Sequence, residues 1–153
     1  MSTLHTEVKD RIEDVTAFMN VMTGGVWLSD DIDTIDGGGY EWADLNGLVV
    51  NNAIVPHAIL RWKDTTPRQA NAPVLGTELE SLEVFGYAPL GGYASLETAF
   101  NALKLGLHYT TFRTDDRYVV RCQYAFLSGE MPAEEYMMTP SRFMRFGFIH
   151  IRR

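Results

Sequence analysis

An alternating strand, a glycine turn and an amphipathic helix follow one another over residues 77–107, and this stretch restricts the fold more than any other. In "TELESLEVFGYA" (77–88) the apolar side chains fall on two faces of an extended strand, Leu82 and Val84 on one and Phe85 and Tyr87 on the other. A helix predicted over 92–107 has one stripe of apolar side chains that faces the core: Leu96, Phe100, Leu103 and Leu107. The sequence therefore predicts a strand that packs under the helix that follows it.

The turn inside "GYAPLGGYASLETAF" (86–100) has to be compared with a phosphate-binding loop. Gly86 and Gly91 have the spacing of the first half of such a loop. Gly92 stands where the phosphate-binding lysine belongs, and Tyr93 stands where the magnesium-binding hydroxyl belongs. The two chemically active positions are missing, so we interpret Gly91 and Gly92 as a strand-to-helix turn.

The remaining pattern predicts a helix over 3–22, with Thr3 as its cap, and strands over 54–63, 117–127 and 142–152. Residues 26–54 have no sustained period and predict an extended loop with one short strand at 26–28. The proline-rich stretch 64–73 predicts an exposed loop. The order α-β-β-β-α-β-β predicts an α/β (α+β) fold: a small mixed or antiparallel sheet of about four to five strands with two helices on one face.

The last two predicted strands carry apolar residues on both faces. In 117–127, strict alternation puts Cys122 on one face together with Tyr118, Val120, Tyr124 and Phe126, and Val119, Ala125 and Leu127 on the other. Two helices cover only one face of a lone sheet, so the other face needs a second cover. A symmetric partner subunit or the segment 29–53 folded back would each supply it.

Composition indicates one compact domain over residues 1–153. With 46% hydrophobic residues the chain can bury a sizeable core. Its 13 basic and 20 acidic side chains give a net charge of −7, which argues against tight nonspecific binding to nucleic acid or to an anionic membrane. Residues 1–25 are unlike a signal peptide and no long uncharged apolar run occurs, so we expect a soluble protein made in the cytoplasm.

No spacing of reactive residues predicts a catalytic or metal site. The single Cys122 lies within an apolar strand, where a buried inert thiol is expected. The four histidines are scattered and match no zinc motif, so we expect core or surface roles for His5, His57, His108 and His150. Adjacent acid pairs such as Asp115 and Asp116 are typical of solvated loops. We expect no cofactor and no enzymatic activity.

An acidic segment at residues 30–36 has to be compared with a calcium loop. It contains Asp30, Asp31, Asp33 and Asp36. Counting from Asp31, the turn glycine should be residue 36 and the bidentate glutamate residue 42, but these are Asp36 and Trp42. An EF-hand is excluded, while an irregular calcium site stays open.

Several stretches together resemble the tail terminator (tail completion) proteins of long-tailed bacteriophages. They are "EVKDRIEDVTAFMNVM", "VPHAILRWK", "LESLEVFGYAPLGGYASLETAFNALKLGLH" and the closing "RYVVRCQYAFL" with "RFMRFGFIHIR". The third is the most similar, since the family has a strand, a small-residue turn and a helix that begins near a tyrosine. The resemblance covers roughly 3–22 and 54–153; the segment 29–53 is longer and more glycine-rich than the family pattern.

The resemblance implies a virion protein of the tail or neck that assembles in the host cytoplasm. Six copies would form a ring that caps the tail tube, ends its polymerisation and contacts the head connector, while DNA passes through the lumen without specific binding. We expect Asp30, Asp31, Asp33 and Asp36 to line the ring or its lumen. We expect a subunit or tube interface to include Tyr40, Trp42 and a docking loop over 129–140 with Met131, Tyr136, Met137 and Met138. The alternative is that the apolar side chains of this loop pack into the core of their own subunit.

Two other functions remain open from the sequence. A head-tail connector or neck protein would share the small size, the acidic character and the ring assembly. A small-molecule-binding domain or enzyme would need a pocket that the sequence does not indicate.

Overall fold

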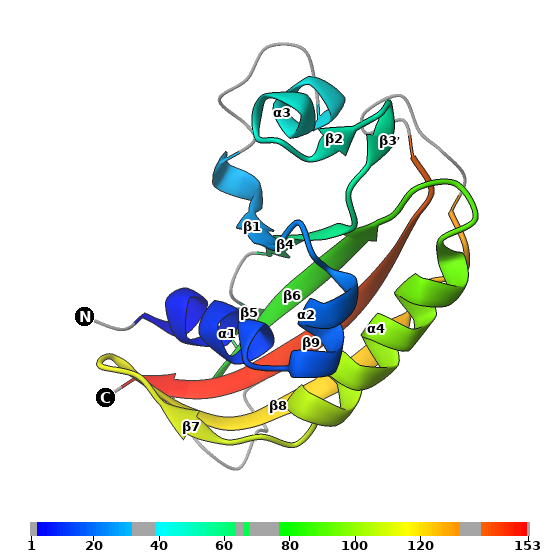
Figure 1. The fold of residues 1–153 in the computed structure, drawn as a ribbon. Helices are drawn as coiled ribbons and strands as arrows, with labels where there is room; N and C mark the ends of the chain where they lie inside the picture. The colour runs from blue at the N-terminus through cyan, green and yellow to red at the C-terminus, as the bar shows by residue number, and fades with distance from the viewer. Residues whose placement is uncertain (1–2, 32–38, 64–65, 68–76, 132–138, 153) are drawn as a thin grey trace.

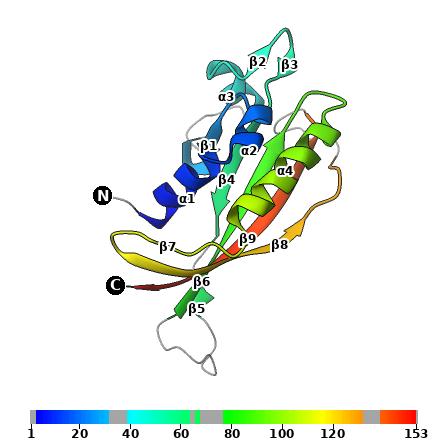
Figure 2. The same cartoon turned by 60° about the horizontal axis from the view of Figure 1, so that its bottom comes forward.

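The computed structural model describes residues 3–31, 39–63, 66–67, 77–131 and 139–152. One twisted mixed sheet carries three helices on one face, while a smaller group of elements sits at one end of the sheet (Figure 1). Figure 2 shows the same helices, α1, α2 and α4, side by side over the sheet. The predicted α/β (α+β) class is confirmed.

Within the described residues, seven strands form the main sheet, in the order β1-β4-β6-β9-β8-β7, with β5 paired to β6. β1 runs parallel to β4, and the other pairs are antiparallel. The strands are β1 Val26–Leu28, β4 His57–Trp62, β5 Thr66–Pro67, β6 Thr77–Tyr87, β7 Phe112–Arg113, β8 Arg117–Leu127 and β9 Ser141–Arg152. All five predicted strands are present. The sheet has more strands than predicted, because β5 and β7 are two additional strands of two residues each.

Two helices, α1 (Leu4–Glu13) and α2 (Thr16–Val21), replace the single helix predicted over 3–22. The backbone at Val15 is extended, with ψ of 92°, and this breaks the helical period. The break turns α2 so that it packs against α4 and buries Phe18 completely. The predicted cap is confirmed, since the Thr3 side chain accepts the Thr6 N–H at 3.2 Å.

Helix α4 (Tyr93–Leu107) follows the glycine turn and buries the predicted stripe against the sheet. The main core lies between the helices and the even-numbered side chains of β6 and β9, and includes Leu82, Val84, Met144, Phe146 and Phe148. Gly86 lies directly under the Phe100 ring, where a β-carbon would approach that ring to 2.9 Å. The predicted packing of strand under helix is therefore confirmed.

Strand β8 contains two irregularities that change its faces. Its register with β9 shifts between Val119 and Arg121 and again between Tyr124 and Phe126. A bulge adds one residue and thus reverses the alternation that follows it. Val119 and Cys122 therefore share the buried face, while Phe126 is 37% exposed. The predicted strict alternation was wrong, because a bulge leaves no mark in the hydrophobic pattern.

Residues 39–54 are folded and do not form the extended loop that the sequence predicted. They form helix α3 (Gly39–Leu45) and a hairpin of β2 (Val49–Val50) and β3 (Ala53–Ile54). The hairpin turn places Asn51 and Asn52 at φ of 52° and 61°. Asparagine tolerates this left-handed conformation, which two-residue hairpin turns require. A turn signal was therefore present in "VVNNAI".

Candidate interaction surfaces

We call the side of the sheet opposite α1, α2 and α4 the outer face. It is built from the odd-numbered positions of β4, β6 and β9, because their even-numbered neighbours are buried in the main core. Cross-strand registers arrange it in rows, such as Leu79 beside Ile149 and Ser81 beside Gly147. The bulges in β8 add Arg121 and Gln123 to these rows. The outer face thus continues from β4 across to β8.

One end of the outer face is covered by the chain itself. Trp42, Leu48 and Ile54 form a second core with Ile59 of β4 and Tyr87 of β6. The Trp42 ring meets the Trp27 ring edge-on at 5.3 Å. Residues 39–54 therefore supply part of the cover that the sequence required, and they do so at the end of the sheet where β4 begins and β6 ends.

The rest of the outer face has no cover within the described residues. Leu79, Tyr118 and Phe126 are 36–41% exposed, although each lies in or beside the sheet. A shallow hollow of about 200 Å³ lies above Gly147, and it is lined by Leu79, Ser81, Gln123, Arg145 and Ile149, among others. The Leu79 side chain lies close over Gly147, because a β-carbon there would come within 3.1 Å of Leu79 Cδ1. This area is both apolar and indented, as protein-binding surfaces often are.

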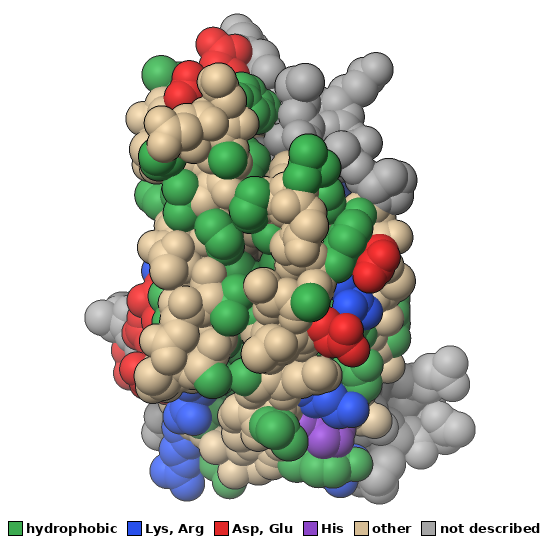
Figure 3. Space-filling model, turned by 45° about the vertical axis from the view of Figure 1, so that its right-hand side comes forward, with side chains coloured by type: hydrophobic (Ala, Val, Ile, Leu, Met, Phe, Trp, Pro, Cys, Tyr) green, Lys and Arg blue, Asp and Glu red, His purple; other side chains and the backbone are tan. Residues whose placement is uncertain are grey.

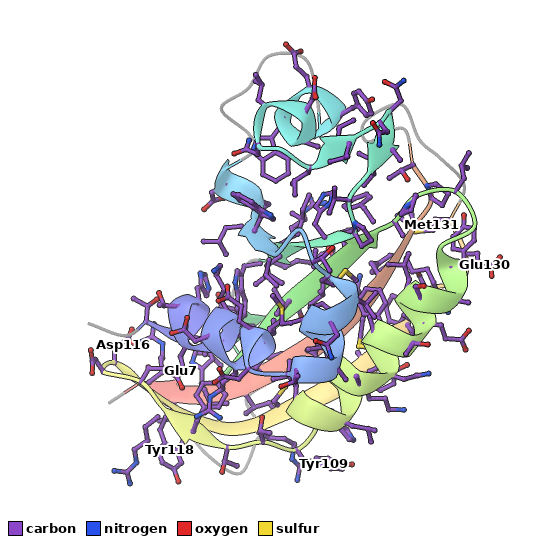
Figure 4. The ribbon with its side chains drawn as sticks, viewed as in Figure 1. Glu7, Tyr109, Asp116, Tyr118, Glu130 and Met131 are labelled. Carbon is purple, nitrogen blue, oxygen red and sulfur yellow. The ribbon has the colours of Figure 1, made fainter. Side chains whose placement is uncertain are left out.

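Positive charge accompanies the apolar side chains of the outer face. Among the described residues, the strand registers place four arginines on this face: Arg61, Arg113, Arg121 and Arg145. Arg145 donates to Glu83 at 3.1 Å. Three of these guanidinium groups lie over aromatic rings: Arg145 over Phe126 at 4.8 Å, Arg113 over Tyr118 at 5.2 Å and Arg121 over Tyr109 at 5.5 Å. Figure 4 shows Tyr109 and Tyr118 projecting at this edge, away from α1 and α2.

Negative charge is concentrated in another part of the chain. Residues 26–54 hold six acids and no lysine or arginine, so this segment carries −6 of the net −7 and the rest of the chain carries 13 minus 14, or −1. Glu41 and Asp44 of α3 are exposed, as is Leu45 at 71%. Figure 3 shows acidic side chains at the end of the molecule that α3 forms; further acidic side chains lie lower on the same view, next to Lys and Arg side chains.

A cluster of titratable side chains lies on the other face of the sheet, under α1. His5 bonds to Glu80 at 2.6 Å, and His150 Nε2 lies 3.4 Å from the same carboxylate. Burial opposes the charge on Glu80, but the contacts from His150 and His5 outweigh it and lower the Glu80 pKa from 4.5 to about 2. The His5 ring also stacks on Trp62 at 4.1 Å. The cluster fastens α1 to the sheet.

This histidine-carboxylate cluster borders a hollow of about 330 Å³ that also includes Asp30 and Lys63. His150 has Glu80 on its Nε2 side and Glu78 on its Nδ1 side, at 4.0 Å, so the carboxylates do not converge on one point. In the part of the chain that the structure describes, no group of three or more His, Cys, Asp or Glu is arranged to hold a metal ion. The cluster could not be predicted from residue spacing, since His5 and His150 stand at opposite ends of the sequence.

Two other reactive side chains are buried and held by the fold. Burial raises the pKa of Cys122 to about 12, and a hydrogen bond with Thr110 offsets only part of that effect. His57 bonds through Nδ1 to the Val55 carbonyl at 2.8 Å, and its burial lowers its pKa. Neither group has the exposure that a nucleophile or a general base requires.

The predicted interface residues have different surroundings. Trp42 is 2% exposed within the second core, and Tyr40 packs on the same core. Met131 pairs with Ser141 in an isolated bridge, and its carbonyl accepts a hydrogen bond from the Tyr93 hydroxyl. Figure 4 places Met131 and Glu130 at the start of α4. Tyr136, Met137 and Met138 lie outside the described residues.

The four predicted acidic residues are likewise divided. Asp30 is exposed and lines the hollow beside His5. Asp31 ends the 3-10 turn η1 (Ser29–Asp31). Asp33 and Asp36 lie outside the described residues.

None of the helices in the described ranges has the length and apolar character needed to cross a membrane.

No protein-family model matches the sequence, and no curated protein matches it. Among solved structures, the fold is similar to that of a chain in the "Virion of native gene transfer agent (GTA) particle". The TM-score is 0.57 at 8% sequence identity, and the match covers 94% of this chain and 91% of that chain. At this identity the likeness establishes the fold, and it does so along nearly the whole length of both chains.

Proposed function

We propose that this chain is a structural virion protein that caps the end of a phage tail tube as a hexameric ring. The observation that carries the proposal is the fold shared along 94% of the chain with a component of a gene transfer agent virion. A shared fold alone is an analogy and assigns no activity. The resemblance of four sequence stretches to tail terminator proteins is a separate reason to choose this role.

In this role the protein works by shape and contact, without a chemical reaction. Six subunits close a ring on the last layer of the tail tube, prevent further subunits from adding, and offer their free side to the head connector. The partly uncovered outer face supports an assembling protein, since a subunit that acts alone has no use for an exposed apolar hollow. The buried Cys122 and His57 give no support to catalysis.

The charge of the chain suits a ring that DNA passes through. Six copies carry six times −7, or −42. Phosphate contacts by clustered lysines and arginines would hold the duplex with a strength that depends on salt. We expect a lumen that is acidic or neutral, with the acidic segment 26–54 as the main source of its charge.

Assembly of tail tubes in the presence of the protein tests this function. Purified tail tube protein is polymerised with and without the chain, and the length distribution is measured by electron microscopy. The proposed role predicts shorter tubes with a ring of six subunits at one end. Unchanged tube length, a ring of another order, or a ring that binds the connector but not the tube would reject the tail-terminator role; the last result would favour a connector or neck protein.

A further inference from the structure

The uncovered part of the outer face has the features of a docking site. Leu79, Ile149 and Phe126 supply apolar surface, and the hollow above Gly147 supplies a recess. Arg121 stands in the same row as Leu79 and Ile149, so charge borders the recess. A fitting partner surface therefore carries an apolar side chain that projects, together with acidic neighbours.

The chain itself presents such a surface at its α3 end. Leu45 is 71% exposed at the end of α3, and Val50 of β2 is 54% exposed. Glu41 and Asp44 are exposed on the same short helix. No lysine or arginine occurs anywhere in residues 26–54, so nothing on this segment repels an arginine-bearing face.

We propose that the hollow above Gly147 receives Leu45 of a second copy of this chain, with Asp44 and Glu41 of that copy facing the outer-face arginines. The proposal rests on the proposed ring assembly, because it names the contact by which neighbouring subunits meet. Charge complementarity selects this occupant, since residues 26–54 hold six acids and no basic side chain, whereas the outer face presents Arg61, Arg113, Arg121 and Arg145. Complementary charges of this kind fix orientation and register.

The two surfaces cannot meet within one subunit. The second core joins α3 to the Tyr87 end of β6, whereas the hollow lies beside Leu79. Eight residues of strand separate these positions, which is roughly 26 Å. Because the two surfaces differ, the contact is head to tail and leaves a pair of subunits with one free hollow and one free α3 surface. Contacts of this type close into rings when the rotation between subunits allows it.

Single-stranded nucleic acid is the other occupant that a basic and aromatic sheet face suggests. The structure favours a protein partner, because the hollow beside the outer-face arginines is lined by apolar side chains such as Leu79 and Ile149, which suit a projecting apolar side chain. The overall charge of the chain also opposes a polyanion.

Disulfide trapping tests the contact on the full chain. The double variant Leu45→Cys/Gln123→Cys places one thiol on α3 and one at the edge of the hollow. If Leu45 enters the hollow, the two β-carbons come close enough for a disulfide between subunits. Mild oxidation is expected to give a ladder of linked species that ends at six on a non-reducing gel. Native Cys122 stays unreactive because it is buried, with a pKa of about 12.

The matched control is Leu105→Cys/Gln123→Cys. Leu105 is 86% exposed on α4, on the opposite side of the sheet from the hollow, so it offers an equally accessible thiol in the wrong place. The control and both single variants are expected to give dimers at most. A ladder no stronger than that of the control overturns the proposal.

A charge exchange tests the same contact without cysteine. Asp44→Arg and Arg121→Asp are each expected to weaken self-association by about two- to fivefold, the range for an exposed charge pair, and the doubly exchanged chain is expected to recover part of the loss. Sedimentation measures the association, and thermal melting confirms that each variant folds. Equal association in all four proteins contradicts the contact.

The same variants separate this inference from the proposed function and from nucleic-acid binding. If wild-type rings cap tail tubes while the trapped ladder is absent, the contact is wrong and the function stands. If the ladder forms but tube length does not change, the contact stands and the function is wrong. If a fluorescent single-stranded oligonucleotide binds the wild type and Arg121→Asp abolishes that binding, the face holds nucleic acid and the proposal is overturned.

Discussion

Replacing Gly86 by alanine tests how tightly the strand packs under α4. The new β-carbon would lie 2.9 Å from two atoms of the Phe100 ring and 3.1 Å from Leu96, whereas ordinary contacts are 3.4–4 Å. The ring must therefore move by about 0.5 Å, the difference between 3.4 and 2.9 Å. Phe100 is fully buried and packs against Phe18 at 6.2 Å, so little free space lies around it.

The expected cost follows from two opposing effects. Overpacking of this kind destabilises a core by about 1–3 kcal/mol. Alanine also restricts the unfolded chain, which stabilises the fold by about 0.4–1 kcal/mol. We expect a net loss of about 0–2.6 kcal/mol in the free energy of unfolding. The midpoint, about 1.3 kcal/mol, corresponds to a fall in Tm of about 3–5 °C.

Urea unfolding followed by circular dichroism measures this loss, with Gly129→Ala as the matched control. No atom lies within 4 Å of a β-carbon at Gly129, so that variant is expected to be as stable as the wild type or slightly more stable. Phe100→Leu removes the ring atoms that clash, and it is expected to cost less in the Gly86→Ala background than alone. Equal stability of the Gly86 and Gly129 variants would refute the packing argument.

Three further predictions concern the cores and their titratable groups. Phe146→Ala removes a fully buried ring of the main core and is expected to cost about 3–5 kcal/mol in urea unfolding; a loss under 1 kcal/mol would contradict that burial. The Glu80 pKa is lowered from 4.5 to about 2 in the fold, so its contribution is complete above pH 4.5 and is lost as the pH falls toward 2. Unfolding measured across that range should show a smaller acid loss in Glu80→Gln, and an unchanged loss would count against the histidine contacts. The His57 pKa is lowered from 6.5, so the unfolded chain binds a proton more readily and stability falls as the pH drops below 6.5; His57→Gln should reduce this slope, and the same slope in both proteins would exclude His57 as its source.

Long periodic elements could be predicted from the sequence, because burial on one face imposes its period directly. Strand β6 and helix α4 follow from alternation and from a stripe at steps of three and four, and their inward residues are those expected. The break at Val15 could not be predicted in this way, since the apolar stripe continues through it. At the break Val15 lies against Gly106 of α4, a contact between segments far apart in the chain that the local pattern does not reveal.

The candidate surface was harder to predict than the fold. The charge and the apolar surface of the outer face depend on which way Arg121 and Phe126 point. The bulges of β8 set the direction of both side chains, and they arise only when the strand pairs. Trp42 illustrates the opposite difficulty, because a large aromatic residue in an acidic segment has the composition of an interface, yet it fills the second core. Residue type alone does not distinguish a core that the chain builds for itself from a surface that it offers to a neighbour.

The position of β9 in the sheet has a consequence for synthesis of the protein. Residues 141–152 form a central strand, between β6 and β8, although they come late in the chain. Until this strand emerges from the ribosome, β6 and β8 have no common partner, and the main core lacks Met144, Phe146 and Phe148. Pairings so distant in sequence form slowly, because loop closure has to precede them. A nascent subunit therefore has no finished outer face until β9 has paired with both of its neighbours.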